Sequence, residues 1–227
     1  SKGIYKSLNC GVGLLDKKAN VNKNLKIVCT KINSEERNII MPKQMHSGKF
    51  HFISKKINKK RVKCDALITN QKKIPIGVLT ADCAPIIIFD PKKTMISVVH
   101  VGWRGAFKGI IKNVITFFKK KGSKPKDLIA VVGPAISVKN YEIKKDFLKK
   151  FLNKNKKNKI YFKFFHNKIF FDLRKYIFFQ IKKLGINKLE IINKDTFSGK
   201  NSYFSARRSL IKKQNDYGRN ISLIMIN

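Results

Sequence analysis

Short apolar runs at close intervals set the limits on how this chain can fold. Runs of this length, rich in Ile, Val and Phe, are typical of strands buried inside a sheet. Some neighbouring runs are separated by fewer residues than the crossover of roughly a dozen that parallel strands require, so these strands must pair antiparallel. The predicted strands cover residues 76–79, 85–89, 95–101, 128–132, 160–165, 189–192 and 221–226.

Two longer segments repeat their apolar residues with the period of an amphipathic helix. The first spans residues 106–118, and the lysines and Gly122 that follow suit a helix C-terminus. The second spans residues 173–184, with Asp172 as the expected N-cap and Gly185 just past its end. Strands interleaved with helices predict an α/β fold around a mixed sheet.

The 227 residues, 43% of them hydrophobic, are enough for one sizeable core. No internal repeat and no linker rich in Pro, Gly and Ser divides the chain, so we expect one domain over residues 1–227. No run approaches the roughly eighteen apolar residues of a membrane-spanning helix, and the first residues lack an apolar stretch of signal-peptide length. The four cysteines include no CxxC pair. We therefore expect a cytoplasmic protein with reduced thiols and no contact with a membrane.

The formal net charge of +38 raises the question of nucleic-acid binding. Only seven of the 51 basic residues are Arg, however, and Arg is preferred over Lys for bidentate contacts with phosphates and bases. The lysines are scattered through the chain and form no familiar RNA-binding signature. We expect a solvated basic surface that binds RNA weakly at low salt, without a specific nucleic-acid partner.

Three residues with metal-binding side chains lie in or beside turns: His46, Cys83 and His100, the last near the end of the predicted strand 95–101. Two imidazoles and one thiolate suit zinc and leave its fourth position for a water or a substrate, as in catalytic zinc sites. The simpler interpretations are a hydrogen-bonded core histidine and a small buried thiol. The metal site is favoured because Asp82 precedes Cys83 and the glycine-rich segment 102–105 follows His100. This segment permits a tight turn before a helix whose first amides favour anions such as phosphate.

Further motifs follow one another in a fixed order over nearly the whole chain. The blocks LTADC at residues 79–83 and HVGWRG at residues 100–105 are the most specific of them. The others lie at residues 44–46, 65–69, 77–85, 133–136, 141–142, 204–208 and 218–219. On these motifs the sequence resembles the zinc-dependent purine nucleoside phosphorylase family, long labelled laccase-domain or polyphenol oxidase proteins, which includes peptidoglycan-editing-factor-like members.

The resemblance implies a single-domain layered α/β/β/α sandwich with mixed sheets. It implies one zinc ion per chain, with His46, Cys83 and His100 as the ligands. It also implies phosphorolysis of adenosine, inosine, guanosine and methylthioadenosine with inorganic phosphate as co-substrate, and adenosine deamination at the same metal. Departures from the family pattern at positions 25, 66 and 195 spare the ligands but leave the preferred nucleoside open.

Phosphorolysis requires a cationic clamp for phosphate, and the planar guanidinium of arginine fits phosphate in bidentate fashion. The candidates for phosphate or substrate binding are Gln44, Arg104, Arg207 and Arg208. Asp82 is expected either to orient a metal ligand or to transfer a proton to or from the substrate. The expected catalytic residues are therefore Asp82, Cys83 and His100.

Two other functions remain open. Cys83 with His100 as its base would make a covalent nucleophile, as in a hydrolase acting on peptidoglycan precursors. A basic RNA-binding protein with a structural zinc is the alternative from a different class. The older copper-oxidase label conflicts with the number of histidines, because four histidines cannot supply the imidazoles for a cluster of several coppers. The oligomeric state is not determined by the sequence.

Overall fold

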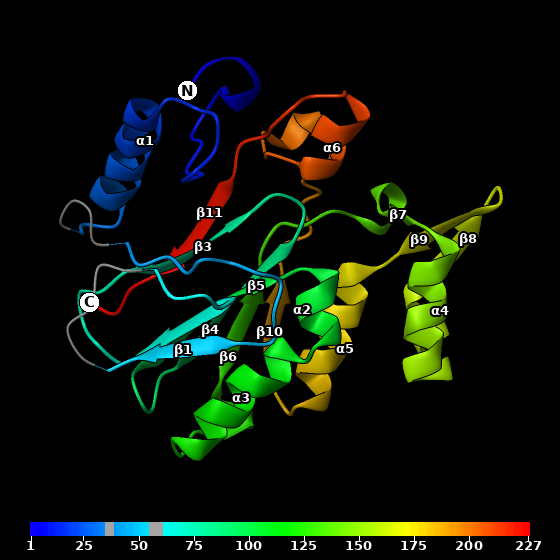
Figure 1. The fold of residues 1–227 in the computed structure, drawn as a ribbon. Coiled ribbons are helices and arrows are strands. Elements are labelled where there is room, and N and C mark those ends of the chain that lie inside the picture. The colour runs from blue at the N-terminus through cyan, green and yellow to red at the C-terminus, as the bar shows by residue number, and fades with distance from the viewer. Residues whose placement is uncertain (35–38, 55–60) are drawn as a thin grey trace.

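A mixed sheet of six strands lies at the centre of the structure, in the order β1-β2-β5-β4-β6-β10 (Figure 1). The computed structural model describes residues 1–34, 39–54 and 61–227. The strands are β1 (Phe50–Ile53), β2 (Ala66–Thr69), β4 (Ala84–Asp90), β5 (Met95–Val101), β6 (Ile129–Val132) and β10 (Lys188–Ile191). The two outer pairs, β1–β2 and β6–β10, are parallel and the three inner pairs are antiparallel, which confirms the mixed sheet expected from the short intervals between apolar runs.

A second, two-stranded sheet packs on one face of the central sheet. It pairs β3 (Ile76–Thr80) with β11 (Asn220–Ile224) in antiparallel fashion. Side chains of β3 alternate between two hydrophobic clusters, as the period of a strand requires. Val78 packs with Ile96 and Val98 of β5, whereas Leu79 packs on the opposite side with Val28 of α1 (Lys18–Lys31).

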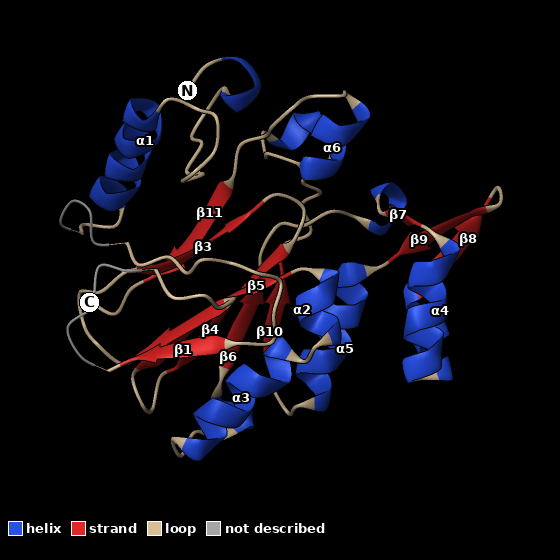
Figure 2. Cartoon of the chain, viewed as in Figure 1, coloured by secondary structure: helices blue, strands red, loops and turns tan. Residues whose placement is uncertain are grey.

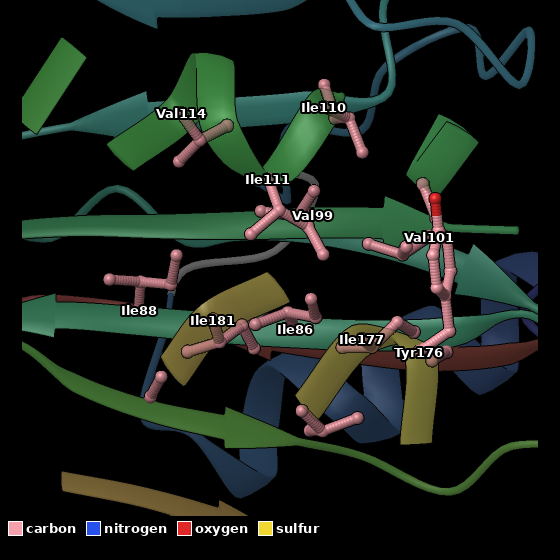
Figure 3. Packing of buried hydrophobic residues seen from close by; sticks show 14 of the residues in the cluster. Ile86, Ile88, Val99, Val101, Ile110, Ile111, Val114, Tyr176, Ile177 and Ile181 are labelled. Carbon is pink, nitrogen blue, oxygen red and sulfur yellow. The ribbon is translucent and has the colours of Figure 1, made fainter. Parts of the chain in front are cut away.

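Helices cover the other face of the central sheet. Figure 3 shows Ile86, Val99 and Val101 of the strands meeting side chains of α3 (Ile110–Lys120) and α5 (Leu173–Lys183). The inner strands β2 and β5 of the central sheet are thus buried on both faces, which explains their largely apolar character. The order of layers is α3 and α5, the six-stranded sheet, the two-stranded sheet, and α1 (Figure 2), and it confirms the α/β/β/α sandwich.

The predicted second helix is confirmed in detail, but the first is divided. The Asp172 side chain caps α5 by accepting a hydrogen bond from the backbone N–H of Lys175, and Gly185 takes a left-handed φ of 91° after its end. The segment predicted as one helix forms α2 (Trp103–Phe107) and α3, because Gly109 between them has a φ of 82°. A residue in this conformation cannot continue an α-helix.

Several elements escaped the sequence pattern. Helix α1 is rich in Lys and Asn and has only a weak apolar stripe, so its period is hard to detect. The other unpredicted elements are the helices α4 (Lys145–Lys154) and α6 (Ala206–Ile211), and the strands β1, β2, β7 (Glu142–Ile143) and β9 (Lys168–Phe171). Short 3-10 helices lie at Gly3–Tyr5, Pro125–Asp127, Val138–Asn140, Lys156–Tyr161 and Gly199–Asn201. Among the helices described, none is both long enough and apolar enough to cross a bilayer.

A cluster of aromatic rings joins the third sheet to the rest of the molecule. This sheet has the order β7-β9-β8, with β8 at Phe162–Phe165, and lies with α4 at one end of the structure (Figure 1). Phe151 of α4 is fully buried, and its ring centroid lies 4.9 Å from that of Phe107 in α2 and 5.3 Å from that of Tyr176 in α5. It also lies 5.0 Å from Phe171 in β9, so one side chain links α4 to two other helices and a strand.

Replacing Phe151 by Ala should therefore lower the free energy of unfolding by about 3–5 kcal/mol, because a large cavity would open where these elements meet. The matched control is Phe164→Ala, since Phe164 is 55% exposed and its loss should change stability by only about 0.5 kcal/mol. Urea denaturation of the two variants measures both values. Equal midpoints would contradict the role given to Phe151.

Candidate metal centre

The structure brings together His46, Cys83 and His100 from three separate segments. The ligand atoms of the three side chains all lie within 4.8 Å of one another. Cys83 Sγ lies 3.8 Å from His46 Nε2, and the two imidazole centroids are 4.7 Å apart with their planes at 79°. Such a convergence of two nitrogens and one sulfur is what the metal-site interpretation requires.

Strand register brings Cys83 near His100, because Cys83 lies opposite Gly102 and therefore diagonally across from His100. In the β4–β5 pair, Ala84 lies opposite Val101, so Cys83 falls opposite Gly102, one step beyond the pair. A Cβ atom on Gly102 would lie 2.8 Å from Cys83 Sγ and 2.9 Å from a carbon of the His46 ring. Only glycine leaves room for the cluster at this position, because real Cβ atoms do not approach other atoms so closely.

A buried carboxylate, Asp65, lies behind the cluster. Its Oδ1 accepts a hydrogen bond of 2.9 Å from His100 Nδ1, and the side chain has no exposed surface. The same carboxylate accepts bonds from the backbone N–H groups of Met45, His46 and Ser47. In the sequence Asp65 stood out only as part of the motif at residues 65–69, whereas Asp82 was expected either to orient a metal ligand or to transfer a proton. The available signal was a carboxylate placed directly before the apolar residues 66–68.

The charges at the cluster perturb one another. Burial alone would raise the pKa of the Cys83 thiol, but the imidazoles of His100 and His46 outweigh it and lower the pKa to about 6. Burial alone would lower the pKa of His100, but the Cys83 sulfur and Asp65 raise it to about 9. Burial alone would raise the pKa of Asp65, but the hydrogen bonds from His100 and Ser47 hold it well below the usual range. Without a metal, the site therefore favours a thiolate beside an imidazolium.

The donor set fits a single zinc ion. With Zn–N and Zn–S bonds of about 2.0–2.3 Å, tetrahedral coordination places ligand atoms about 3.3–3.8 Å apart, and the Cys83–His46 separation already lies at this distance. His100 uses Nδ1 on Asp65, which leaves Nε2 for a metal. The remaining histidines are elsewhere, with His51 on β1 and His166 in the turn between β8 and β9.

A cleft of about 450 Å³ opens onto the cluster, a volume within the range of small-molecule sites. Its lining consists of His46, Ala81, Asp82, Cys83, Trp103, Arg104, Ile136, Tyr141, Leu173, Ala206, Arg207, Leu210 and Tyr217. The Arg104 guanidinium lies 5.3 Å from the centre of the Trp103 ring. Arg207 lies over the ring of Tyr141 and donates a 2.9 Å hydrogen bond to the carbonyl of Glu142. The cleft thus combines cationic and aromatic side chains beside the ligand cluster.

Two residues expected to contact substrate do not line this cleft. The Gln44 side chain accepts a hydrogen bond from the backbone N–H of Leu79 at 2.9 Å and donates one to its carbonyl at 2.7 Å. The Arg208 guanidinium donates to the backbone carbonyls of Thr196 and Phe197, both at 2.8 Å, and to that of Tyr203. Both side chains are therefore used to hold backbone segments together.

Asp82 does line the cleft, but its carboxylate also ties two segments together. Oδ1 accepts a 2.7 Å hydrogen bond from the Thr196 hydroxyl, and Oδ2 accepts one of the same length from the backbone N–H of Arg207. Asp82 has a left-handed φ of 82°, unusual for a residue with a side chain, and these bonds stabilise it beside Cys83. A role in proton transfer stays a prediction.

A larger hollow, of about 640 Å³, lies between α4 and the β8–β9 hairpin. Its walls are mainly lysines and phenylalanines, among them Lys145, Lys149, Phe164 and Phe165. Neither the predicted ligands nor the predicted substrate residues line it. The smaller cleft is the candidate site, because it is the one lined by predicted ligands and by arginines.

Comparison with known proteins identifies the family of the chain and its relatives. The profile of a family described as multi-copper polyphenol oxidoreductase laccase matches residues 1–227. A protein of Rickettsia conorii named purine nucleoside phosphorylase is 35% identical over 159 residues, which are 69% of this chain and 65% of that protein. A Haemophilus influenzae protein, also named purine nucleoside phosphorylase, is 29% identical over 223 residues, which are 97% of this chain and 87% of that protein. In Bacillus subtilis, the purine nucleoside phosphorylase YlmD is 30% identical over 152 residues, covering 63% and 55%.

Solved structures share the fold. The hypothetical protein YfiH of Bacillus licheniformis superposes with a TM-score of 0.89 at 23% identity, covering all of this chain and 88% of that one. YlmD of Geobacillus stearothermophilus gives a TM-score of 0.88 at 20% identity, covering 100% and 87%. These likenesses support the layered α/β architecture described above.

The pKa of Cys83 predicts a distinctive pH dependence for the metal-free protein. Because the pKa is lowered to about 6, the thiolate is populated above pH 6 and lost below it. Alkylation of Cys83 by iodoacetamide after chelation should therefore reach half its maximal rate near pH 6, whereas an ordinary thiol does so near about 8.5. A Cys83→Ser variant measures the background from the buried Cys10, Cys29 and Cys64. A midpoint near that of an ordinary thiol would contradict the electrostatics described here.

Proposed function

The chain belongs to the multi-copper polyphenol oxidoreductase laccase family, and from this premise we propose that it is a zinc-dependent purine nucleoside phosphorylase. The proposal covers one domain, residues 1–227, with one zinc ion per chain. Its substrates would be adenosine, inosine, guanosine or methylthioadenosine, with inorganic phosphate. The observation that carries it is the cluster of His46, Cys83 and His100 at a cleft that also holds Arg104 and Arg207.

The donor set argues for zinc and against the copper chemistry in the family's description. Within the described residues, His46 and His100 are the imidazoles of the cluster, and a multicopper centre needs several more. One thiolate and two imidazoles form a three-ligand zinc site with an open position. A zinc ion bound there would supply Lewis acidity and an activated water, the latter for adenosine deamination as a hydrolytic side reaction.

In phosphorolysis a phosphate oxygen attacks C1′ of the ribose, the bond from C1′ to the purine nitrogen breaks, and ribose-1-phosphate forms. Among the arginines of the region, Arg104 is best suited to hold the phosphate. Arg208 donates to three backbone carbonyls and Arg207 to one, whereas no described residue accepts a hydrogen bond from the Arg104 guanidinium, which lies beside the Trp103 ring. Its five N–H donors therefore remain for an anion.

The purine that leaves carries the electron pair of the broken bond and needs a proton. Tyr141 lines the cleft, and burial together with the nearby Cys83 raises the pKa of its phenol, so that it stays neutral and can donate a hydrogen bond to the base. We assign to Asp82 the relay of this proton, which the attacking hydrogen phosphate releases as ribose-1-phosphate forms, because Asp82 lines the same cleft and each carboxylate oxygen keeps a further lone pair. A cytoplasmic location and the lack of a specific nucleic-acid partner stay predictions.

A second candidate, a hydrolase with a cysteine nucleophile, is supported by one observation. His100 Nδ1 is bonded to Asp65, and its ring raises the thiolate character of Cys83, which is the order of a nucleophile, a base and an orienting carboxylate. A coordinated thiolate is a poor nucleophile, so the two functions exclude each other at a zinc-loaded site. Stoichiometric zinc that protects Cys83 from alkylation would favour the phosphorylase.

The decisive experiment incubates zinc-loaded protein with adenosine, with and without phosphate, and separates the products. We expect adenine and ribose-1-phosphate only when phosphate is present, and inosine in its absence if deamination also occurs. Chelation or Cys83→Ser should lower both activities at least about 100-fold, because either change removes the metal site. Phosphorolysis that survives complete removal of zinc would refute the proposal.

Arg104→Ala should raise the KM for phosphate at least about tenfold, equivalent to about 1.4 kcal/mol, and leave the KM for the nucleoside within about twofold. Arg104→Lys should recover only part of the loss, since a lysine cannot form the bidentate contact. Arg207→Ala provides the comparison and should have the smaller effect. If Arg207→Ala raises the KM for phosphate more than Arg104→Ala does, Arg207 and not Arg104 is the residue that binds phosphate.

A further inference from the structure

We propose that Asp65 is a positioning residue that holds both histidines of the cluster in their metal-binding arrangement through a single carboxylate. The inference rests on the metal site of the proposed function. It concerns a residue outside the ligand set that has no contact with the cleft. Two independent sets of hydrogen bonds carry it, one to a strand and one to a loop.

The first set fixes His100. In the antiparallel β2–β5 pair, Ala66 lies opposite Val99, so that Asp65 falls opposite His100, and the backbone N–H of His100 donates to the carbonyl of Asp65 at 2.7 Å. Directly opposed residues point to the same face of a sheet. The side chains therefore meet, with His100 Nδ1 2.9 Å from Asp65 Oδ1. A proton held on Nδ1 for this bond leaves Nε2 as the lone-pair nitrogen for the cluster.

The second set fixes His46. Asp65 Oδ1 accepts from the N–H of His46 at 2.9 Å, and Oδ2 accepts from both the N–H and the hydroxyl of Ser47 at 2.6 Å. The N–H of Met45 also points at the carboxylate, 3.1 Å from Oδ1. Successive amides directed at one anion form a nest, which stabilises unusual backbone geometry. His46 has such geometry, with a left-handed φ of 53°.

These bonds require a carboxylate. In the described part of the chain, the hydrogen bonds to the Asp65 side chain all come from donors, and the side chain has no contact with solvent. An asparagine of the same size would turn an NH₂ group toward one set of donors and leave it unpaired in a buried site. Loss of the carboxylate should therefore release His46, His100 or both, without touching a ligand.

Asp90 is the matched control for the loss of a buried carboxylate. It is 1% exposed and also accepts bonds from backbone amides, those of Lys92 and Lys93. It pairs with Met95 at the opposite end of the β4–β5 hairpin from Cys83. Asp90→Asn thus changes a buried carboxylate of the same central sheet at a place remote from the cluster.

The experiment measures zinc affinity by competition with a chromophoric chelator for the full chain and for Asp65→Asn, Asp90→Asn and Ser47→Ala. Asp65→Asn should weaken zinc binding about 10–100-fold, the range found when a group supporting a metal ligand is removed. Ser47→Ala should weaken it less, because the N–H of Ser47 remains, and Asp90→Asn should bind as the wild type does. Cobalt substitution adds a spectroscopic readout, in which Asp65→Asn should shift the ligand-field bands while the thiolate-to-metal band persists.

Equal zinc affinity and identical cobalt spectra for Asp65→Asn and the wild type would overturn the inference. So would an equal loss in Asp90→Asn, which would show a general effect of stability. If Asp65→Asn does not fold, nitrogen NMR of His100 in the wild-type protein decides: protonation at Nδ1 supports the inference, and protonation at Nε2 alone overturns it. Failure of the wild type itself to bind zinc would instead refute the proposed metal site, so the two failures are distinguishable.

Discussion

The pairing of β5 with its two antiparallel neighbours is the constraint on which the candidate site depends. Its register with β2 places Asp65 opposite His100, and its register with β4 places Cys83 opposite Gly102. Because side chains alternate along a strand, a shift by one residue would turn His100 away from both partners. The same hydrophobic packing that buries β5 between the helices and the second sheet therefore keeps the ligands in place.

Buried charge gives the site its chemical character. Asp65 remains ionised without solvent because the amides of residues 45–47 and the His100 ring donate hydrogen bonds to it, and its charge in turn favours a proton on His100. Cys83 lies close enough to two imidazoles to favour the thiolate. These interactions suit a cation that replaces the proton between thiolate and imidazole. They also explain why a cysteine–histidine–aspartate arrangement arises at the same place, and why the presence of metal separates the two candidate functions.

The candidate site could be predicted in part because ligand chemistry is local. His46, Cys83 and His100 were identifiable from residue type, neighbouring glycines and the motifs around them. The roles of Gln44 and Arg208 could not be predicted. Residue type alone does not show whether a side chain binds a backbone carbonyl or a phosphate. The support for His100 came from Asp65 and not from Asp82, which binds Thr196 and Arg207. Only the pairing of strands distant in sequence decides which carboxylate faces a given histidine.

The sequence by itself determined the class of the fold and most of its inner strands, because short apolar runs at close intervals allow few arrangements. It also determined the kind of donors that a metal would meet. Tertiary structure alone decided the division at Gly109, the lysine-rich α1 that covers the second sheet, and the choice of Arg104 as the guanidinium with free donors. The physical reason is range: burial patterns and turn chemistry act over a few residues, whereas hydrogen-bond partners and packing are set by segments that meet only after the chain has folded.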